Sequence, residues 1–253
     1  MVDVLRKEYD AEAVNYDTYW TASSPFIRLV NELFISALGD ATGAEILDLA
    51  GGSGIQARYA VNAGAAAVDI VDISQEMMRE GQKAEAALNR HVMRWFDGDI
   101  SKSLDHLPLK PHYDIVMANW PLDHSDNMAV LEGMLSNIEK YLKPGGRFLG
   151  VRCGNPRAAA MQTGELGVIF KDFEDIPGGV KYRFAFNSSQ SDLMASSMEA
   201  TYSGSTVIYE KFGLVDVEIE PYENAPVVKE NPELWESFLQ DPGAAMVKAR
   251  KRL

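Results

Sequence analysis

The chain has 253 residues, of which 46% are hydrophobic, enough for one large α/β domain or two small ones around a continuous core. Its formal net charge of −13 at pH 7 repels phosphate backbones, so a nucleic acid partner is not expected and a small or cationic ligand is favoured. The opening MVDVLRKEYD lacks the apolar core of a signal peptide, and no run of about 18 apolar residues follows. These features predict a cytoplasmic protein with no membrane partner.

Two smaller features of the composition carry expectations of their own. The single cysteine, Cys153, allows no internal disulfide and is expected to be a small buried side chain. The one basic cluster, KARKRL at residues 248–253, is expected to be a solvated helix end. No grouping of histidine, cysteine and acidic residues suggests a metal site.

The first clear element is a helix that begins at Ser24-Pro25 and ends at Gly39. Its apolar residues recur at helical spacing: Phe26, Leu29, Val30, Leu33, Phe34 and Ala37. Strand-like and helical patterns then alternate. Strands are expected at 45–49, 67–73, 92–96, 113–118 and 147–152, and helices at about 55–64, 74–89 and 127–142. This alternation predicts an α/β fold with a doubly wound, mostly parallel sheet, whose ligand lies beyond the carboxyl ends of the strands.

The alternation stops between residues 153 and 200. That stretch, with Phe170 and the sequence KYRFAF, is expected to be a hairpin-like insertion that caps the substrate site after the fifth strand. A late strand is predicted at 214–219, followed by a short helix that carries Trp235. We therefore expect a single domain over residues 1–253.

A glycine cluster, ILDLAGGSGIQA at residues 46–57, follows the first strand and raises three possible ligands. A nucleoside triphosphate would require a lysine and a hydroxyl directly after the last glycine, where Ile55-Gln56 supplies neither. A dinucleotide remains possible, because residues 52–57 satisfy G-x-G-x-x-A and Asp72 follows at about the expected spacing. Asp48, however, would repel a pyrophosphate and suits a phosphate-free ligand that carries an ammonium group.

Five motifs in order resemble those of the class I S-adenosylmethionine-dependent methyltransferases, and the resemblance covers nearly the whole chain. The motifs are LDLAGGSG (47–54), VDIVDIS (68–74), FDGDI (96–100), YDIVMANW (113–120) and LKPGGRF (142–148). Ala50 stands where a glycine is commonest. The segments YDAEAVNYD (9–17) and TYSGSTVIYEKFGLVDVE (201–218), with a tryptophan near the C-terminus, are similar to the ubiquinone-biosynthesis and toxoflavin-methyltransferase type.

The resemblance implies S-adenosylmethionine as cofactor, with S-adenosylhomocysteine as its product. It places Asp72 on the ribose hydroxyls, Asp99 on the adenine amino group, Ile100 and Met77 beside the adenine ring, and Tyr16 over the sulfonium. The other cofactor residues that it implies are Asp48, Ala50, Gly51, Gly52, Gly54, Ile73, Asn119 and Trp120. Residues 1–24 would form an N-terminal lid.

Candidates for the substrate side come from the lid, the fourth and fifth strands and the insertion. Tyr9, Trp20 and Phe170 suit an apolar or planar substrate, although ordinary packing explains them nearly as well. Arg152, at the end of the fifth strand, could bind an acidic group. His124 is the first candidate for a catalytic base because histidine titrates near neutrality, and Asp123 is the second.

The sequence thus predicts a methyltransferase of biosynthesis or secondary metabolism. It would transfer a methyl group in line to oxygen, nitrogen or carbon of a small, apolar or aromatic metabolite. One alternative is a cyclase or pericyclase of the same fold, which would use the bound cofactor's charge without consuming it. A second is a nicotinamide-dependent oxidoreductase, suggested by G-x-G-x-x-A. The protein is expected to be a monomer or a homodimer.

Overall fold

The computed structural model describes residues 2–21, 24–187, 189 and 191–253. Its α-helices are α1 (Val2–Thr21), α2 (Pro25–Leu38), α3 (Ile55–Asn62), α4 (Gln75–Ala87), α5 (Met128–Tyr141), α6 (Glu199–Tyr202), α7 (Val207–Lys211), α8 (Pro226–Glu230) and α9 (Pro232–Gln240). Its strands are β1 (Glu45–Leu49), β2 (Ala67–Asp72), β3 (Met93–Asp97), β4 (Tyr113–Met117), β5 (Leu142–Cys153), β6 (Val168–Ile176), β7 (Gly179–Phe186), β8 (Leu193–Met198), β9 (Leu214–Ile219) and β10 (Ala244–Lys251). Within these ranges no helix combines the length and apolarity that a membrane span needs.

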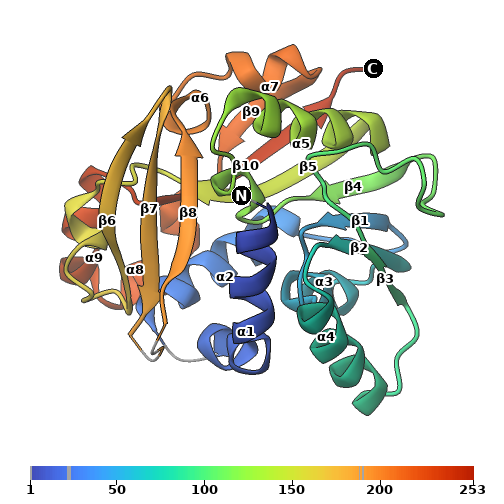
Figure 1. The fold of residues 1–253 in the computed structure, drawn as a ribbon, viewed down its shortest axis with the longest axis horizontal. Helices are drawn as coiled ribbons and strands as arrows, with labels where there is room; N and C mark the ends of the chain where they lie inside the picture. Colours follow the sequence, from blue (N-terminus) through green and yellow to red (C-terminus); the bar gives the residue numbers. More distant parts are fainter. Residues whose placement is uncertain (1, 22–23, 188, 190) are drawn as a thin grey trace.

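The main sheet has seven strands in the order β3-β2-β1-β4-β5-β10-β9 (Figure 1). The strands from β3 to β5 pair in parallel, and β10 pairs antiparallel with both β5 and β9. The strand order reverses between β1 and β4, which makes this the switch point where a ligand is expected. The predicted α/β, doubly wound, mostly parallel sheet is confirmed.

Alternating apolar residues let helices cover both faces of the sheet. In β1, Ile46 packs into the cluster that includes α2 and α3, while Leu47 faces the cluster that includes α5 and α7. The predicted first helix is confirmed as α2: the Ser24 hydroxyl accepts a hydrogen bond from the Ile27 N–H at 3.3 Å, and Gly39 ends the helix with a φ of 56°. The core therefore holds β1 rigidly beneath the glycine cluster.

The other predicted elements agree with the structure to within one or two residues, except around β5. That strand begins at Leu142 rather than Arg147, and its pairing with β4 is irregular between Tyr113 and Ile115. Gly145, which precedes the strand predicted from Arg147, has a φ of 73°. The residues ahead of that strand are thus part of an irregular strand start.

The prediction of a helix end at the basic C-terminus is wrong. Residues up to Lys251 continue β10, in which Val247 and Ala249 are buried while Lys248 points outward and pairs with the Glu220 carboxylate at 2.8 Å. Lysine and arginine stems can cover apolar surface with their charges in water, so a strand tolerates them on its outer positions. The alternation of apolar and basic residues from Val247 to Arg250 was the signal for a strand here.

The stretch from 153 to 200 forms more than a hairpin. Its strands β6, β7 and β8 make a separate three-stranded antiparallel sheet, in which β8 pairs with β7 from Gly179↔Met198 to Phe184↔Leu193. The third strand was missed because all six of its residues are buried, so that its sequence, LMASSM, shows no polar alternation.

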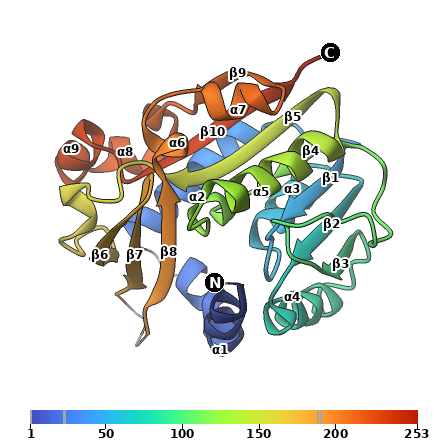
Figure 2. The same ribbon diagram turned by 45° about the horizontal axis from the view of Figure 1, so that its top comes forward.

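Helix α1 lies between the two sheets. It contacts α4 of the main body and β8 of the second sheet, and it crosses in front of the carboxyl ends of the parallel strands (Figures 1 and 2). The helix therefore covers the edge of the sheet at which the switch point opens.

Candidate active site

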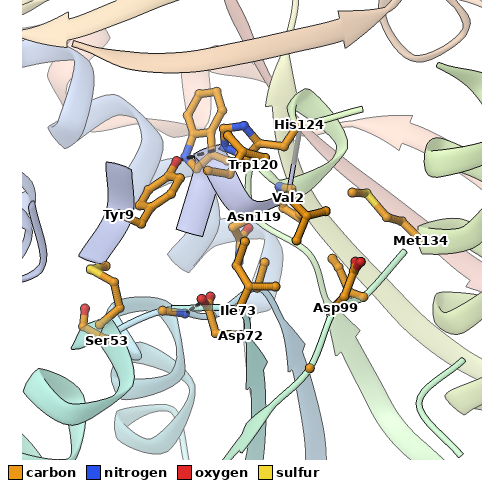
Figure 3. A pocket seen from close by; sticks show the side chains of 18 of the residues that line it. Val2, Tyr9, Ser53, Asp72, Ile73, Asp99, Asn119, Trp120, His124 and Met134 are labelled. Atoms are coloured by element: carbon orange, nitrogen blue, oxygen red, sulfur yellow. Dashed lines mark hydrogen bonds between the residues drawn. The ribbon is translucent and has the colours of Figure 1, made fainter. Parts of the chain in front are cut away.

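A cavity that is partly open to solvent lies at the carboxyl ends of β1, β2 and β4 under α1 (Figure 3). Its lining brings together most of the predicted cofactor residues: Tyr16, Ala50, Gly51, Gly52, Asp72, Ile73, Met77, Asp99, Ile100, Asn119 and Trp120. Tyr9, Trp20 and His124 line it as well. The cavity therefore lies where a ligand is expected at the switch point of the sheet.

The loop between β1 and α3 has an unusual backbone. Ala50, Gly52 and Gly54 have φ values of 61°, 53° and 80°, the left-handed region that only glycine adopts without strain. At Gly51 the constraint is space, since a Cβ atom there would lie 2.6 Å from Asp48 Oδ2. The glycines thus let the loop fold tightly over β1 with its backbone facing the cavity.

Asp72 joins the second strand to this loop. Its Oδ2 accepts a hydrogen bond from the Gly52 N–H and its Oδ1 one from the Ser74 N–H, both at 2.8 Å. Burial raises the pKa of Asp72 to about 6, although the backbone donors act in the opposite direction. The carboxylate is therefore held in one orientation at the cavity wall.

A second carboxylate, Asp99, lies in the turn after β3. Its Oδ1 accepts hydrogen bonds from the backbone N–H and the hydroxyl of Ser101, at 2.9 and 2.7 Å. The Ile100 carbonyl accepts a bond from Asn137 Nδ2 at 2.8 Å, which fixes the turn to α5. Met77, in α4, is buried against Gly52. This part of the cavity combines a polar edge with an apolar wall.

Helix α1 is bonded to the same loops. Its Asp10 accepts a hydrogen bond from the Ser74 hydroxyl at 2.6 Å, and its Asp17 accepts bonds from the Ser53 hydroxyl and, at 2.8 Å, from the Arg58 guanidinium. Residues of the helix that face the cavity are thus fixed in place by loops on which the cavity is built.

A second, mostly apolar cavity adjoins the first. It is lined by Tyr9, Tyr16, Trp20, Phe26, Ile27, Trp120, Asp123, His124, Val168, Phe170, Tyr182, Phe184, Phe186 and Ala195. The second sheet supplies one wall and α1 another. Trp120 stands at the junction of the two cavities and has a φ of 73°, a strained value for a tryptophan.

His124 meets α1 at this junction. The Tyr9 hydroxyl and His124 Nε2 are 2.9 Å apart, and the two rings pack edge to face (Figure 3). Burial lowers the pKa of His124 to about 4. The imidazole is therefore neutral at physiological pH and can accept a proton.

Asp123 lies in the wall of the second cavity only. Its Oδ1 accepts a hydrogen bond from the Ser197 hydroxyl and its Oδ2 one from the Cys153 N–H, both at 2.7 Å. Burial raises the pKa of Asp123 to about 6. Cys153 is fully buried, as its sequence context predicts.

Three of the predicted site residues line neither cavity. Asp48 is buried beneath Gly51, where burial raises its pKa well above the usual range and its Oδ2 has no hydrogen-bond partner. Gly54 begins α3 behind the loop. The buried Arg152 guanidinium donates to the Cys153 carbonyl at 2.6 Å. Since Arg152 lines neither cavity, it is not placed to bind an acidic group of a substrate there.

Several lining residues were not predicted. Val2 and Leu5 line the first cavity together with Tyr9, Tyr16 and Trp20. Their spacing of three, four, seven and four residues places all five on one helical face, a signal that was present in the sequence. Val130 and Met134 of α5 carried no such signal, since they also fit an ordinary core helix. In the described ranges no group of three metal-ligating side chains forms.

Comparison with known proteins shows which protein family this sequence resembles. Residues 46–146 match a family model described as a methyltransferase domain. These residues form a methyltransferase domain of class I, the S-adenosylmethionine-dependent family. The predicted family, fold and cofactor are confirmed.

Three similar proteins extend the match beyond this domain. The ubiquinone/menaquinone biosynthesis C-methyltransferase UbiE of Rubrivivax gelatinosus is 33% identical over 154 residues, 60% of this chain and 57% of the relative, so the chain spans little more than half of that relative's length. The 1,6-didemethyltoxoflavin-N1-methyltransferase of Burkholderia thailandensis superposes with a TM-score of 0.56 at 18% identity, over 99% of this chain and 88% of that one. The [4+2]-cyclase SpnF gives 0.61 at 16% identity, over 98% and 96%. At these identities the two structures show a shared fold.

Proposed function

We propose that this protein transfers a methyl group from S-adenosylmethionine to oxygen, nitrogen or carbon of a small, apolar or aromatic molecule. The observation that carries the proposal is the joining of two cavities, a glycine-rich one that carries the carboxyl groups of Asp72 and Asp99 and an aromatic one. Five residues line both: Tyr9, Tyr16, Trp20, Trp120 and His124. A cofactor in the first cavity and an acceptor in the second would meet at these side chains.

The first cavity fits the cofactor. Asp72 presents a carboxylate suited to two ribose hydroxyls, and the backbone of Gly52 leaves room for a ligand beside it. Among the described lining residues there is no lysine or arginine, which a dinucleotide's pyrophosphate would favour. The acidic residues Asp72 and Asp99 suit a phosphate-free nucleoside with a positively charged amino-acid arm. Asp48 would support this site by packing beneath Gly51, and it would not contact the cofactor.

When bound, S-adenosylmethionine would supply a methyl group on a positively charged sulfur, and that sulfur would leave as a neutral thioether once the acceptor's electron pair had bonded to the methyl carbon. The protein's contribution would be to hold the acceptor in line with the cofactor and to exclude water. Tyr16 and Trp120 would close the site around the reacting atoms, since they line both cavities.

An acceptor hydroxyl or N–H also loses a proton. His124 would take it at Nε2 through the Tyr9 hydroxyl, which lies 2.9 Å from that nitrogen and lines both cavities: the hydroxyl would receive the acceptor's proton and pass its own to the neutral imidazole. Asp123 is a second proton acceptor within the acceptor cavity. For a carbon acceptor the same groups would remove the proton from the methylated carbon.

We assign residues 1–24 as a lid and 153–200 as a cap over the acceptor. Residues 1, 22–23, 188 and 190 lie outside the described part of the chain. The lid assignment rests on α1, whose side chains line both cavities and which bonds to Ser53 and Ser74 of the cofactor loops. The cap assignment rests on Phe170, which comes from the second sheet and lines the acceptor cavity.

Two relatives support a planar acceptor. UbiE is named for ubiquinone and menaquinone, and the Burkholderia thailandensis structure holds 1,6-didemethyltoxoflavin together with S-adenosylhomocysteine. The aromatic walls of the second cavity fit a flat ring of this kind. We infer a biosynthetic role in secondary metabolism for a cytoplasmic monomer or homodimer.

The test is incubation of the purified protein with a methyl-labelled donor and metabolites of its source, followed by mass spectrometry. Label should appear in one small molecule, with one equivalent of S-adenosylhomocysteine formed per product. A rearranged, unlabelled product formed without loss of the donor would support the cyclase instead. A protein that binds the donor but converts no metabolite would refute both activities.

A further inference from the structure

The second cavity has aromatic side chains on nearly every wall. Nine of its lining residues are aromatic: Tyr9, Tyr16, Trp20, Phe26, Trp120, Phe170, Tyr182, Phe184 and Phe186. They pack against one another, with ring centroids 5.0 Å apart for Phe170 and Tyr182 and 6.0 Å for Phe184 and Phe186. Aromatic side chains of this kind can bind a ligand through their electron-rich faces.

Asp123 brings a charge into this aromatic wall. It is 2% exposed, lines the cavity, and forms no ion pair within the described ranges of the chain. Its hydrogen bonds come from the neutral Ser197 hydroxyl and Cys153 N–H, which orient the carboxylate without neutralising it. Because an unpaired buried charge is costly, a cationic ligand group would recover free energy here.

No lysine or arginine lines this position. Among the described lining residues of the second cavity there is none, and His124 is neutral at physiological pH. The Arg152 guanidinium lies near enough to act against the rise in the pKa of Asp123, but the two form no ion pair in the described ranges, and Arg152 donates to the Cys153 carbonyl outside the lining. An anionic acceptor would meet a carboxylate, a neutral imidazole and apolar or aromatic side chains.

We propose that the acceptor carries a small organic ammonium group, which Asp123 and the surrounding aromatic rings bind. This inference rests on the proposed function, because it takes the second cavity as the acceptor site. Aromatic faces attract organic cations more strongly when water is excluded, and a carboxylate adds a direct charge contact. The net charge of −13 favours the approach of such a molecule.

The ammonium is a recognition group and need not be the methylated atom. Asp123 lines the second cavity alone, whereas His124 and Trp120 line both. An acceptor bound through its ammonium at Asp123 would extend its other end toward the junction, where the methyl group arrives. The acceptor class is therefore an aromatic or apolar molecule with a basic amine at a distance from the reacting atom.

Three probes of similar shape and different charge test the proposal: phenyltrimethylammonium, tert-butylbenzene and benzenesulfonate. Their binding is measured by quenching of tryptophan fluorescence, because Trp20 and Trp120 line the cavity. S-adenosylhomocysteine is present to fill the first cavity, and its own binding is recorded separately. The cation should bind about tenfold more tightly than the neutral probe, and the sulfonate most weakly. Equal binding of cation and neutral probe would overturn the proposal.

Two charge-removing substitutions complete the experiment. Asp123→Asn should reduce the preference for the cation to what the aromatic rings contribute, whereas Asp126→Asn, three residues along and outside both cavities, should retain it in full. A cation preference that is undiminished in Asp123→Asn would refute the assignment. If that variant does not fold, the order of affinities of the three probes for the unchanged protein still tests the proposal. Failure of the unchanged protein to bind S-adenosylhomocysteine would count against the proposed function. The three probes would then be measured in the absence of S-adenosylhomocysteine, which still tests the second cavity.

Discussion

The Asp72 carboxylate accepts a hydrogen bond from the backbone N–H of Gly52 at 2.8 Å. This bond ties the end of β2 to the loop after β1, so the two motifs form one surface although 20 residues separate them in sequence. The bond also leaves other lone pairs of the carboxylate for a ligand, since an ionised carboxylate has about four acceptor positions. Cofactor binding and loop conformation therefore depend on the same side chain.

Replacing Asp72 by asparagine should weaken S-adenosylhomocysteine binding by about 10- to 100-fold, because hydrogen bonds to a charged acceptor contribute about 1.5–3 kcal/mol. Isothermal titration calorimetry measures the effect. The matched control is Asp97→Asn, at the exposed end of the neighbouring strand β3 and outside the cavity. Equal affinities in wild type and Asp72→Asn would show that Asp72 does not contact the cofactor.

The affinity for S-adenosylhomocysteine should also depend on pH. Asp72 has a pKa of about 6, so the carboxylate that accepts the ribose hydrogen bonds is present above that pH and is lost below it. Affinity should therefore fall as the pH drops through 6, by about tenfold at about pH 5. Because Asp123 has a similar pKa, two variants are needed to assign the titration. If Asp72 is responsible, the pH dependence should persist in Asp123→Asn and flatten in Asp72→Asn. The reverse pattern would assign the titration to Asp123.

Removal of the Tyr9 hydroxyl tests the proton path to the proposed base. Tyr9→Phe should lower kcat by about tenfold and leave the KM for S-adenosylmethionine nearly unchanged, because His124 Nε2 loses the hydroxyl through which the proton would reach it. His124→Gln should lower kcat by about 100-fold or more. Tyr59→Phe is the control, since Tyr59 packs on Phe34 away from both cavities. An unchanged kcat in His124→Gln would exclude His124 as the base.

The sequence predicted the cofactor side of this site better than the acceptor side. The cofactor residues Gly52 and Asp72 lie in short motifs at strand ends, where the strand itself dictates their position. The acceptor wall comes from the packing of α1 against the sheet β6–β8, and these segments are far apart in the sequence. The aromatic character of Tyr182 and Phe186 was visible in KYRFAF, but their position in the cavity wall was not. Arg152 illustrates the limit: its place at the end of β5 was expected, but not the burial of its guanidinium behind the wall.

The bonds between α1 and the loops should control release of the bound product. Asp17 accepts hydrogen bonds from Ser53 and Arg58, and Asp17→Asn would weaken both because an amide lacks the charge. The dissociation rate of S-adenosylhomocysteine, followed by stopped-flow fluorescence, should rise about tenfold. Asp3→Asn, at an exposed position of the same helix, should leave the rate unchanged. An unaltered rate in Asp17→Asn would show that α1 does not limit release.

Ala50 offers a test of strain in the glycine loop. Its φ of 61° costs a residue with a Cβ about 1–2 kcal/mol, and glycine avoids this cost at an entropic loss of about 0.5–1 kcal/mol in the unfolded chain. Ala50→Gly should therefore raise the free energy of unfolding by about 1 kcal/mol, measured by urea denaturation. The same substitution at Ala84, inside α4, should lower it by a similar amount. Destabilisation by Ala50→Gly would mean that the Ala50 methyl group makes contacts that outweigh its backbone strain.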